Sequence, residues 1–146
     1  MSVAAAVLII LGVIGLVDAT YFVLVSYRAM RPDPRWMPRV CRMDEATCAR
    51  VVDTPSARIL GLPNAVYGVA WYAVAIGAGA AILVKGSLPL CWAYVAVAAA
   101  TVLLSAYLAW ALVVRLHTPC VLCFVGHGVN VGLLAVFGAA CLGLGL

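Results

Sequence analysis

Charged and amide side chains are scarce in this sequence. Charged residues make up only 10% of the 146 residues, glutamine is absent, and asparagine occurs only at Asn64 and Asn130. Hydrophobic residues make up 67% and the mean hydropathy is +1.17, so the composition excludes a water-soluble globular protein, whose surface carries far more charge. The first apolar stretch lacks a charged leader and a cleavage site, and we interpret it as a membrane span and not as a signal peptide. We expect membrane lipid to surround the chain and no nucleic acid to bind it.

Four apolar stretches are each long enough to cross a membrane. A transmembrane helix needs about 20 mostly apolar residues, and such stretches occupy residues 3–27, 62–84, 88–116 and 119–145. Backbone groups in hydrocarbon must be hydrogen-bonded within the segment, which makes these stretches helices. No repeat with a period of about 20–50 residues is present. The sequence therefore predicts a single all-α domain over residues 1–146: a polytopic membrane protein, with a four-transmembrane-helix bundle and a long polar loop, 28–61, between the first two helices.

Two cysteines, Cys120 and Cys123, open the last helix. Pro119 precedes them, and proline suits the first helical position, so we expect both cysteines in the first turn and on one face. Unpaired amides and the helix dipole at that end favour thiolate over thiol. The pattern predicts a redox-active dithiol, with buried structural cysteines as the alternative.

A second cysteine pair, Cys41 and Cys48, lies in the polar loop. Four spans place this loop and the start of the last helix on the same side of the membrane, so the two pairs can meet. Neighbouring arginines stabilise thiolates, and exchange between two pairs proceeds through a mixed disulfide. We therefore interpret the pairs as a relay. A disulfide that only staples the loop is the alternative. A zinc site of all four thiolates is disfavoured because six residues separate the loop cysteines, and we expect no metal.

The remaining cysteines, Cys91 and Cys141, fall at the start of the third helix and the end of the fourth. The same parity places both at the opposite end of the bundle. We predict that they are inert core thiols, because free cysteine is commonly buried.

Several polar side chains lie within the predicted spans, where they are costly and often functional. Asn64 falls in the first turn of the second helix, at the end with the cysteine pairs, and His127 lies one turn deeper than Cys123 on the same face. We interpret both as binding residues. The alternatives are a hydrogen bond between helices for Asn64 and a satisfied core residue for His127. For Asp18, inside the first helix, two roles are open: a functional one, or a carboxyl that is protonated or bonded to a neighbour. Asn130 is interpreted as a helix–helix hydrogen-bonding residue.

Several stretches carry a family resemblance. The clearest are Tyr107-Leu108-Ala109-Trp110 followed by Pro119-Cys120-Val121-Leu122-Cys123, and the start of the second helix, Pro63-Asn64-Ala65-Val66-Tyr67-Gly68. With the loop cysteine pair, they resemble the vitamin K epoxide reductase family over nearly the whole chain. The stretch Asp18-Ala19-Thr20-Tyr21 is similar to the first helix of prokaryotic members. Many of those members carry a fused thioredoxin-like domain, which this sequence lacks, so we expect a partner in trans.

This resemblance implies a quinone-dependent thiol oxidoreductase that generates disulfides. A thioredoxin-fold redox protein would give two electrons to Cys41/Cys48, which would pass them to Cys120/Cys123 and on to a membrane quinone (menaquinone, ubiquinone or vitamin K-type). By the same resemblance Cys41 meets the partner, Cys48 exchanges with Cys120, and Cys123, the deeper thiol, reacts with the quinone ring. Reduction of vitamin K epoxide by the same cysteines is the alternative within this class.

The resemblance also assigns a quinone pocket. Asn64 matches the asparagine that hydrogen-bonds a quinone oxygen, and His127 stands where family members often have tyrosine. Tyr67 and Trp71 extend the face of Asn64, although aromatic residues at such spacing usually serve packing. The resemblance also implies that Leu108, Leu112 and Leu116 of the third helix form the apolar wall of the pocket. The family's hydroxyl position after the loop pair corresponds to Thr54, with the nearby Ser56 as the alternative. Asp18 is a candidate supporting residue.

A different class of function is a small non-enzymatic membrane bundle or a transporter with a disulfide-stapled loop. Transporters more often show repeated or interrupted helices, and none is evident in this sequence. We therefore favour the enzyme.

The sequence leaves open which side of the membrane carries the cysteine pairs. Seven arginines between Arg28 and Arg58, together with Arg115, lie on that side, against Lys85 alone on the other. Lysine and arginine are enriched in cytoplasmic loops, so this bias favours a cytosolic active face. The family resemblance favours an extracytoplasmic one, where disulfides normally form.

Overall fold

Four long helices dominate the structure, a computed structural model that describes residues 3–29, 51, 54–117 and 120–143. They are α1 (Val3–Ser26), α3 (Asn64–Lys85), α4 (Cys91–Trp110) and α5 (Val121–Cys141). A π-helical turn, Ala111–Arg115, continues α4, and each of the four segments is long and apolar enough to cross a membrane. The prediction of an all-α, four-helix membrane protein is confirmed.

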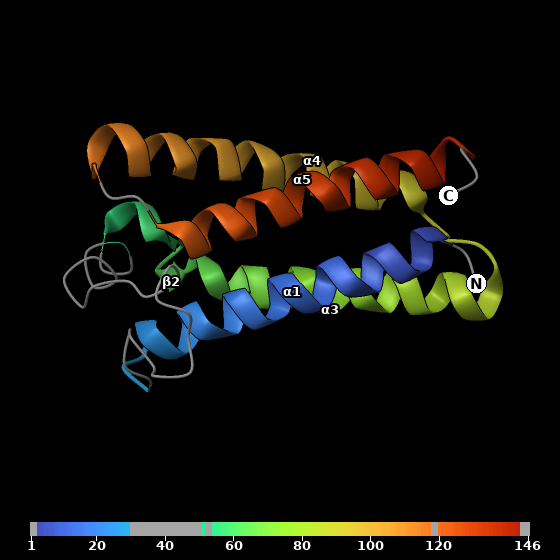
Figure 1. Cartoon of the computed structure of the whole chain (residues 1–146), viewed down its shortest axis with the longest axis horizontal. Helices are drawn as coiled ribbons and strands as arrows, with labels where there is room; N and C mark the ends of the chain where they lie inside the picture. The colour runs from blue at the N-terminus through green and yellow to red at the C-terminus, as the bar shows by residue number, and fades with distance from the viewer. Residues whose placement is uncertain (1–2, 30–50, 52–53, 118–119, 144–146) are drawn as a thin grey trace.

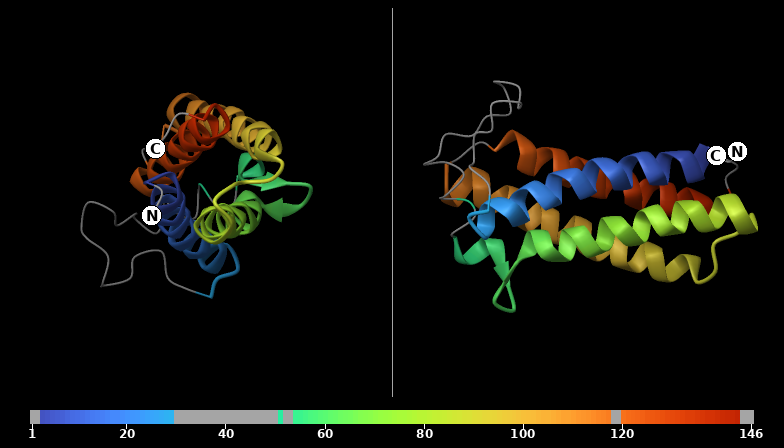
Figure 2. Two further views of the ribbon diagram at one scale, coloured as in Figure 1. Left: turned by 90° about the vertical axis from the view of Figure 1, so that its right-hand side faces the viewer. Right: turned by 90° about the horizontal axis from the view of Figure 1, so that it is seen from below.

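The four helices lie side by side in one bundle (Figures 1 and 2). α1 packs along α3, α4 packs along α5, and α1 also contacts α5. The end of α1 and the starts of α3 and α5 therefore lie at one end of the bundle, and the connection between α3 and α4 lies at the other (Figure 1).

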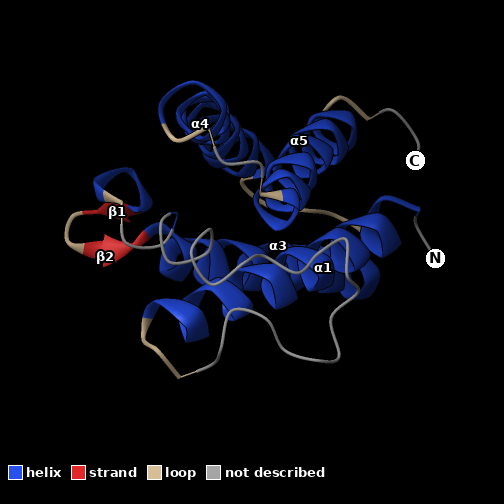
Figure 3. Ribbon diagram, turned by 60° about the vertical axis from the view of Figure 1, so that its left-hand side comes forward, coloured by secondary structure: helices blue, strands red, loops and turns tan. Residues whose placement is uncertain are grey.

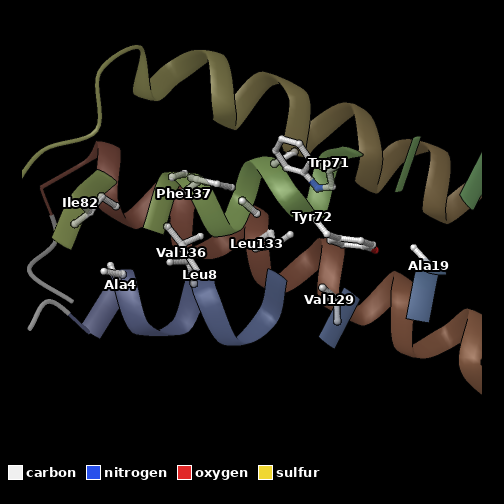
Figure 4. Close-up of a cluster of buried hydrophobic side chains, with 14 residues drawn as sticks. Ala4, Leu8, Ala19, Trp71, Tyr72, Ile82, Val129, Leu133, Val136 and Phe137 are labelled. Atoms are coloured by element: carbon white, nitrogen blue, oxygen red, sulfur yellow. The ribbon is translucent and has the colours of Figure 1, made fainter. Parts of the chain in front are cut away.

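The bundle has a closely packed core in the half that contains the α3–α4 connection. Leu8 of α1 and Leu133 and Phe137 of α5 have no exposed surface (Figure 4). The Phe137 ring stacks on Tyr94 of α4, with 5.3 Å between ring centroids, and contacts Trp71 of α3. All four helices therefore contribute to this core.

Small residues allow α1 and α3 to approach closely. A Cβ atom at Gly79 of α3 would lie 2.9 Å from the carbonyl oxygen of Ala5 and 2.8 Å from Cγ1 of Ile9, both on α1. Lipid provides no hydrophobic force between helices, so close van der Waals contact of this kind contributes much of their association. Gly79 is therefore a packing position.

We expect the Gly79→Ala variant to be about 1–3 kcal/mol less stable than the Gly77→Ala variant, because backbone atoms of α1 cannot move away from the added methyl group. Gly77, on the same helix, has open space around it, so the two variants share the change in helix propensity and differ in packing. Reversible unfolding in mixed micelles measures the difference. Equal stabilities would contradict a tight α1–α3 interface.

A short hairpin precedes α3. A 3-10 turn, Pro55–Ala57, leads into β1 (Arg58–Ile59), which pairs antiparallel with β2 (Leu62–Pro63) (Figure 3). The two turn residues, Leu60 and Gly61, have φ values of 51° and 84°, and positive φ at both central positions is the geometry of a type I′ hairpin turn. The sequence had assigned these residues to the polar loop and to the first turn of the second helix.

Three helices begin later than the sequence suggested, including α4, which starts at Cys91 and not at residue 88. α3 starts at Asn64, immediately after β2, and α5 starts at Val121 with Cys120 as its N-cap. Cys120 has an extended backbone (φ −114°, ψ 102°), so only Cys123 of the pair lies within the first helical turn. Pro119, expected at the first helical position, lies outside the described residues.

Candidate functional site

The cysteine pair at the start of α5 forms a disulfide, with 5.3 Å between the two Cα atoms. The Cys120 sulfur also accepts a hydrogen bond from the Cys123 amide at 3.2 Å, which satisfies one of the amides that a helix start leaves unpaired. The N-terminal end of the helix dipole lies at the same place and favours negative charge on sulfur. The local structure is therefore suited to redox chemistry at these two sulfur atoms.

The two cysteines have different surroundings. Cys120 has no exposed surface and belongs to a small buried cluster with Tyr21, Val25 and Leu112. Cys123, three residues further along, lines a partly open cavity between the helices. One sulfur is thus enclosed by protein, and the other borders a space that a small molecule can enter.

The cavity has a volume of about 190 Å³ and occupies the half of the bundle that contains the start of α5. All four long helices contribute to its wall. Few direct contacts join α3 to α4 among the described residues, and the cavity lies between them. Apolar side chains with a small number of polar groups line it, which is the usual composition of a small-molecule site.

Most of the residues that the sequence assigned to a quinone pocket lie around this cavity. Those lining it, besides Cys123, are Asn64, Tyr67 and Trp71 of α3, Leu108 of α4, Leu112 and Leu116 at the π-helical turn, His127 of α5, Thr54, and Asp18 of α1. Ser56 lies in the 3-10 turn, and its side chain is outside the description. Cys41 and Cys48 also lie outside the described residues.

Two of these residues use their hydroxyl groups to hold neighbouring backbone. The Tyr67 hydroxyl donates a hydrogen bond to the Ile59 carbonyl oxygen at 3.2 Å, and so ties α3 to the hairpin. The Thr54 hydroxyl donates to the Val51 carbonyl oxygen at 2.8 Å. Both positions therefore shape the wall where the polar loop joins the bundle.

Four buried polar atoms in the cavity wall have no hydrogen-bond partner within the described structure. They are Oδ1 of Asp18, Nε1 of Trp71, Nε2 of His127 and Oδ1 of Asn130. Buried polar groups are nearly always paired in native proteins. Such a group of unpaired donors and acceptors around one cavity is the chemistry expected of a site for a polar small molecule.

The sequence did not assign Tyr72, Ser105 or Asn130 to the cavity wall, although all three line it. Tyr72 donates a hydrogen bond through its hydroxyl to the Gly126 carbonyl oxygen at 3.3 Å, and Asn130 donates to the Ser105 hydroxyl at 2.9 Å. The second bond joins α5 to α4, so the expectation that Asn130 links helices is confirmed. Ser105 itself lies one turn before Leu108 on α4, and this polar residue inside a span was the available signal.

Cys91 and Cys141 form a second disulfide, with 5.7 Å between Cα atoms. The prediction that they are inert core thiols is therefore wrong. Cys91 is the first residue of α4 and Cys141 the last of α5, and both are only partly buried. Because α4 and α5 are antiparallel neighbours, these two ends meet. The bond closes the end of the helix pair remote from Cys123.

A four-helix membrane bundle with a cysteine disulfide beside a partly open cavity is the arrangement of a membrane-embedded redox protein. The family model described as the Vitamin K epoxide reductase family matches residues 6–137, most of the chain. The chain belongs to this family, and it is an integral multi-pass membrane oxidoreductase. No curated protein sequence matches the chain significantly.

Proposed function

We propose that this protein is a quinone-dependent thiol oxidoreductase that generates disulfides. Two electrons pass from a reduced thioredoxin-fold protein to Cys41/Cys48, then to Cys120/Cys123, and finally to a membrane quinone. The observation that carries the proposal is the position of Cys123, at the border of a largely apolar cavity whose wall has unpaired polar atoms.

The quinone-reducing step is a two-electron exchange. The Cys120/Cys123 dithiol loses two electrons and two protons and becomes the disulfide. The quinone gains the two electrons and the two protons and becomes the hydroquinone. Cys123 is the thiol that reaches the ring, because it lines the cavity and Cys120 does not. Asn64 and His127, also on the cavity wall, supply side-chain hydrogen bonds that orient the ring, and Leu108 and Leu112 supply an apolar surface.

The disulfide is reduced again by exchange with the loop pair. Val51, three residues after Cys48 in the sequence, packs against the buried cluster that contains Cys120. This contact supports Cys48 as the cysteine that exchanges with Cys120, through a mixed disulfide. Cys41 is then the cysteine that accepts electrons from the partner protein.

The proposal is tested with the purified full chain in detergent or liposomes. A reduced thioredoxin-fold protein is added with a short-chain menaquinone or ubiquinone, and quinone absorbance and protein thiols are followed together. We expect one quinone to be reduced for each dithiol oxidised. No reduction of either quinone would overturn the proposal, and turnover with vitamin K epoxide alone would assign the epoxide reductase activity instead.

The cavity end of the bundle faces the cytosol in this proposal. In the described part of the chain, three exposed arginines stand at this end, Arg28, Arg58 and Arg115, whereas the exposed Lys85 stands at the other. The Arg115 guanidinium lies 5.2 Å from the centre of the Trp110 ring, a pairing suited to a membrane–water interface. Enrichment of arginine on one side supports a cytoplasmic location for that side.

Orientation is measured with single cysteines introduced after the natural ones are replaced by serine. Leu60→Cys probes the exposed hairpin turn, and Ser87→Cys probes the exposed α3–α4 connection. In intact cells, an impermeant maleimide is expected to label Ser87→Cys and to leave Leu60→Cys protected. The reverse pattern would place the active end outside.

A further inference from the structure

Polar residues from all four long helices line the inner part of the cavity, and one of them, Thr101 of α4, donates through its hydroxyl to the Ala98 carbonyl oxygen of its own helix. Four others are Asp18 of α1, Tyr72 of α3, Ser105 of α4 and Asn130 of α5, and all four line the cavity. Asn130 lies seven residues beyond Cys123 on α5, about 10 Å along the helix axis. We call these four residues the inner polar cluster.

Asp18 lies against α5 because position 126 has no side chain. A Cβ atom at Gly126 would be 2.9 Å from Oδ2 of Asp18 and 3.9 Å from the Tyr72 hydroxyl. The Tyr72 hydroxyl donates to the carbonyl oxygen of the same glycine. The Asp18 carboxyl is thus held beside Gly126, one helical turn deeper in the membrane than Cys123.

The hydrogen bonds in the cluster leave the Asp18 carboxyl available. Its Oδ1 atom is buried without a partner, and no lysine or arginine of the described residues lines the cavity to form an ion pair with it. Tyr72 is committed to Gly126, and the Asn130 amide nitrogen to Ser105. An ionisable side chain inside a membrane span usually marks a functional site.

We propose that Asp18 is the proton donor to the quinone oxygen that lies deeper in the cavity. This inference rests on the proposed quinone reduction. The Asp18 carboxylic acid donates a hydrogen bond to that oxygen and transfers its proton as two electrons arrive from Cys120/Cys123. The carboxylate regains a proton from the two that the dithiol releases on forming its disulfide. Over one cycle the quinone gains two electrons and two protons, the dithiol loses them, and Asp18 is unchanged.

The Asp18→Asn variant separates proton donation from packing. Asparagine keeps the size and a hydrogen-bond donor but has no proton to transfer. We expect kcat for a short-chain quinone to fall about 100-fold, the usual scale for loss of a general acid. KM is expected to change less than threefold, as is the dissociation constant of the same quinone, measured by quenching of tryptophan fluorescence. A kcat within threefold of the wild type would overturn the proposal, as would a kcat loss explained by weaker binding.

A glycine pair on α5 provides a test that leaves Asp18 in place. The Gly126→Ala methyl group pushes against Oδ2 of Asp18, whereas Gly128 has open space around it. We expect Gly126→Ala to lower kcat at least tenfold relative to Gly128→Ala, with both variants folded as judged by gel filtration. Equal kcat values would overturn the assignment of Asp18, and this pair decides the question if Asp18→Asn does not fold. A wild-type protein that reduces no quinone would instead remove the proposed function.

Discussion

We expect the Cys123→Ser variant to lose quinone reduction by at least about a thousandfold, the scale of loss seen when a reacting group is removed from an enzyme. Cys123 is the cysteine of the α5 pair that lines the cavity, and serine can neither form the disulfide nor supply electrons. The loss must be equal with protein and small-molecule dithiols, because both routes pass through this sulfur atom. Single-turnover quinone absorbance measures it.

The matched control removes two other sulfur atoms. The double variant Cys91→Ser/Cys141→Ser lacks the disulfide at the opposite end of α4 and α5, and its turnover is expected to stay within about threefold of the wild type below its unfolding temperature. If Cys123→Ser retained a tenth or more of the activity, the cavity would not be the site of electron transfer. A stapled, non-enzymatic bundle would then be the better explanation of the chain.

The Cys41→Ala variant is expected to separate the two electron donors. Transfer from a reduced thioredoxin-fold protein should fall by a factor on the order of a thousand, because the variant lacks the sulfur that we propose the partner attacks. Turnover with dithiothreitol should remain, since a small dithiol can reduce the remaining disulfide directly. The measurement is quinone reduction with each donor in parallel.

A trapping experiment identifies the intermediate behind this difference. A thioredoxin-fold partner that lacks its second cysteine is expected to form a stable mixed disulfide with the wild-type chain and none with Cys41→Ala. Mass spectrometry of the trapped species locates the bond. Equal loss of activity with both donors, or a trapped bond at Cys48, would remove the assignment of Cys41.

The four helices could be predicted from the sequence because a long apolar stretch in lipid must satisfy its backbone hydrogen bonds internally, and a helix does so. The same regularity predicts which residues share a face. Asn64, Tyr67 and Trp71 follow helical spacing on α3, and all three line the cavity. Periodicity within single helices thus carries much of the information about the candidate site.

Short irregular elements and contacts between helices could not be predicted from helical periodicity. The hairpin has strands of two residues, too short for a periodic pattern. In the π-helical turn the Leu116 amide bonds to the Ala111 carbonyl oxygen, and no sequence signal marks this five-residue spacing. The position of Asp18 beside Gly126 joins residues more than a hundred positions apart, so its significance emerges only when α1 and α5 are seen together.

The two disulfides of the described structure lie at opposite ends of a membrane-spanning bundle, so the compartments nearest to them differ. In either orientation, one of them lies at the cytosolic end of the bundle, and in the cytosol glutathione and thioredoxin systems keep most thiols reduced. If the cavity end faces the cytosol, the Cys91–Cys141 bond lies on the opposite, oxidising side of the membrane, where disulfides persist without enzymatic reoxidation. The Cys120–Cys123 bond then lies at the reducing side, and under the proposed function it is the one that quinone reforms at each turnover.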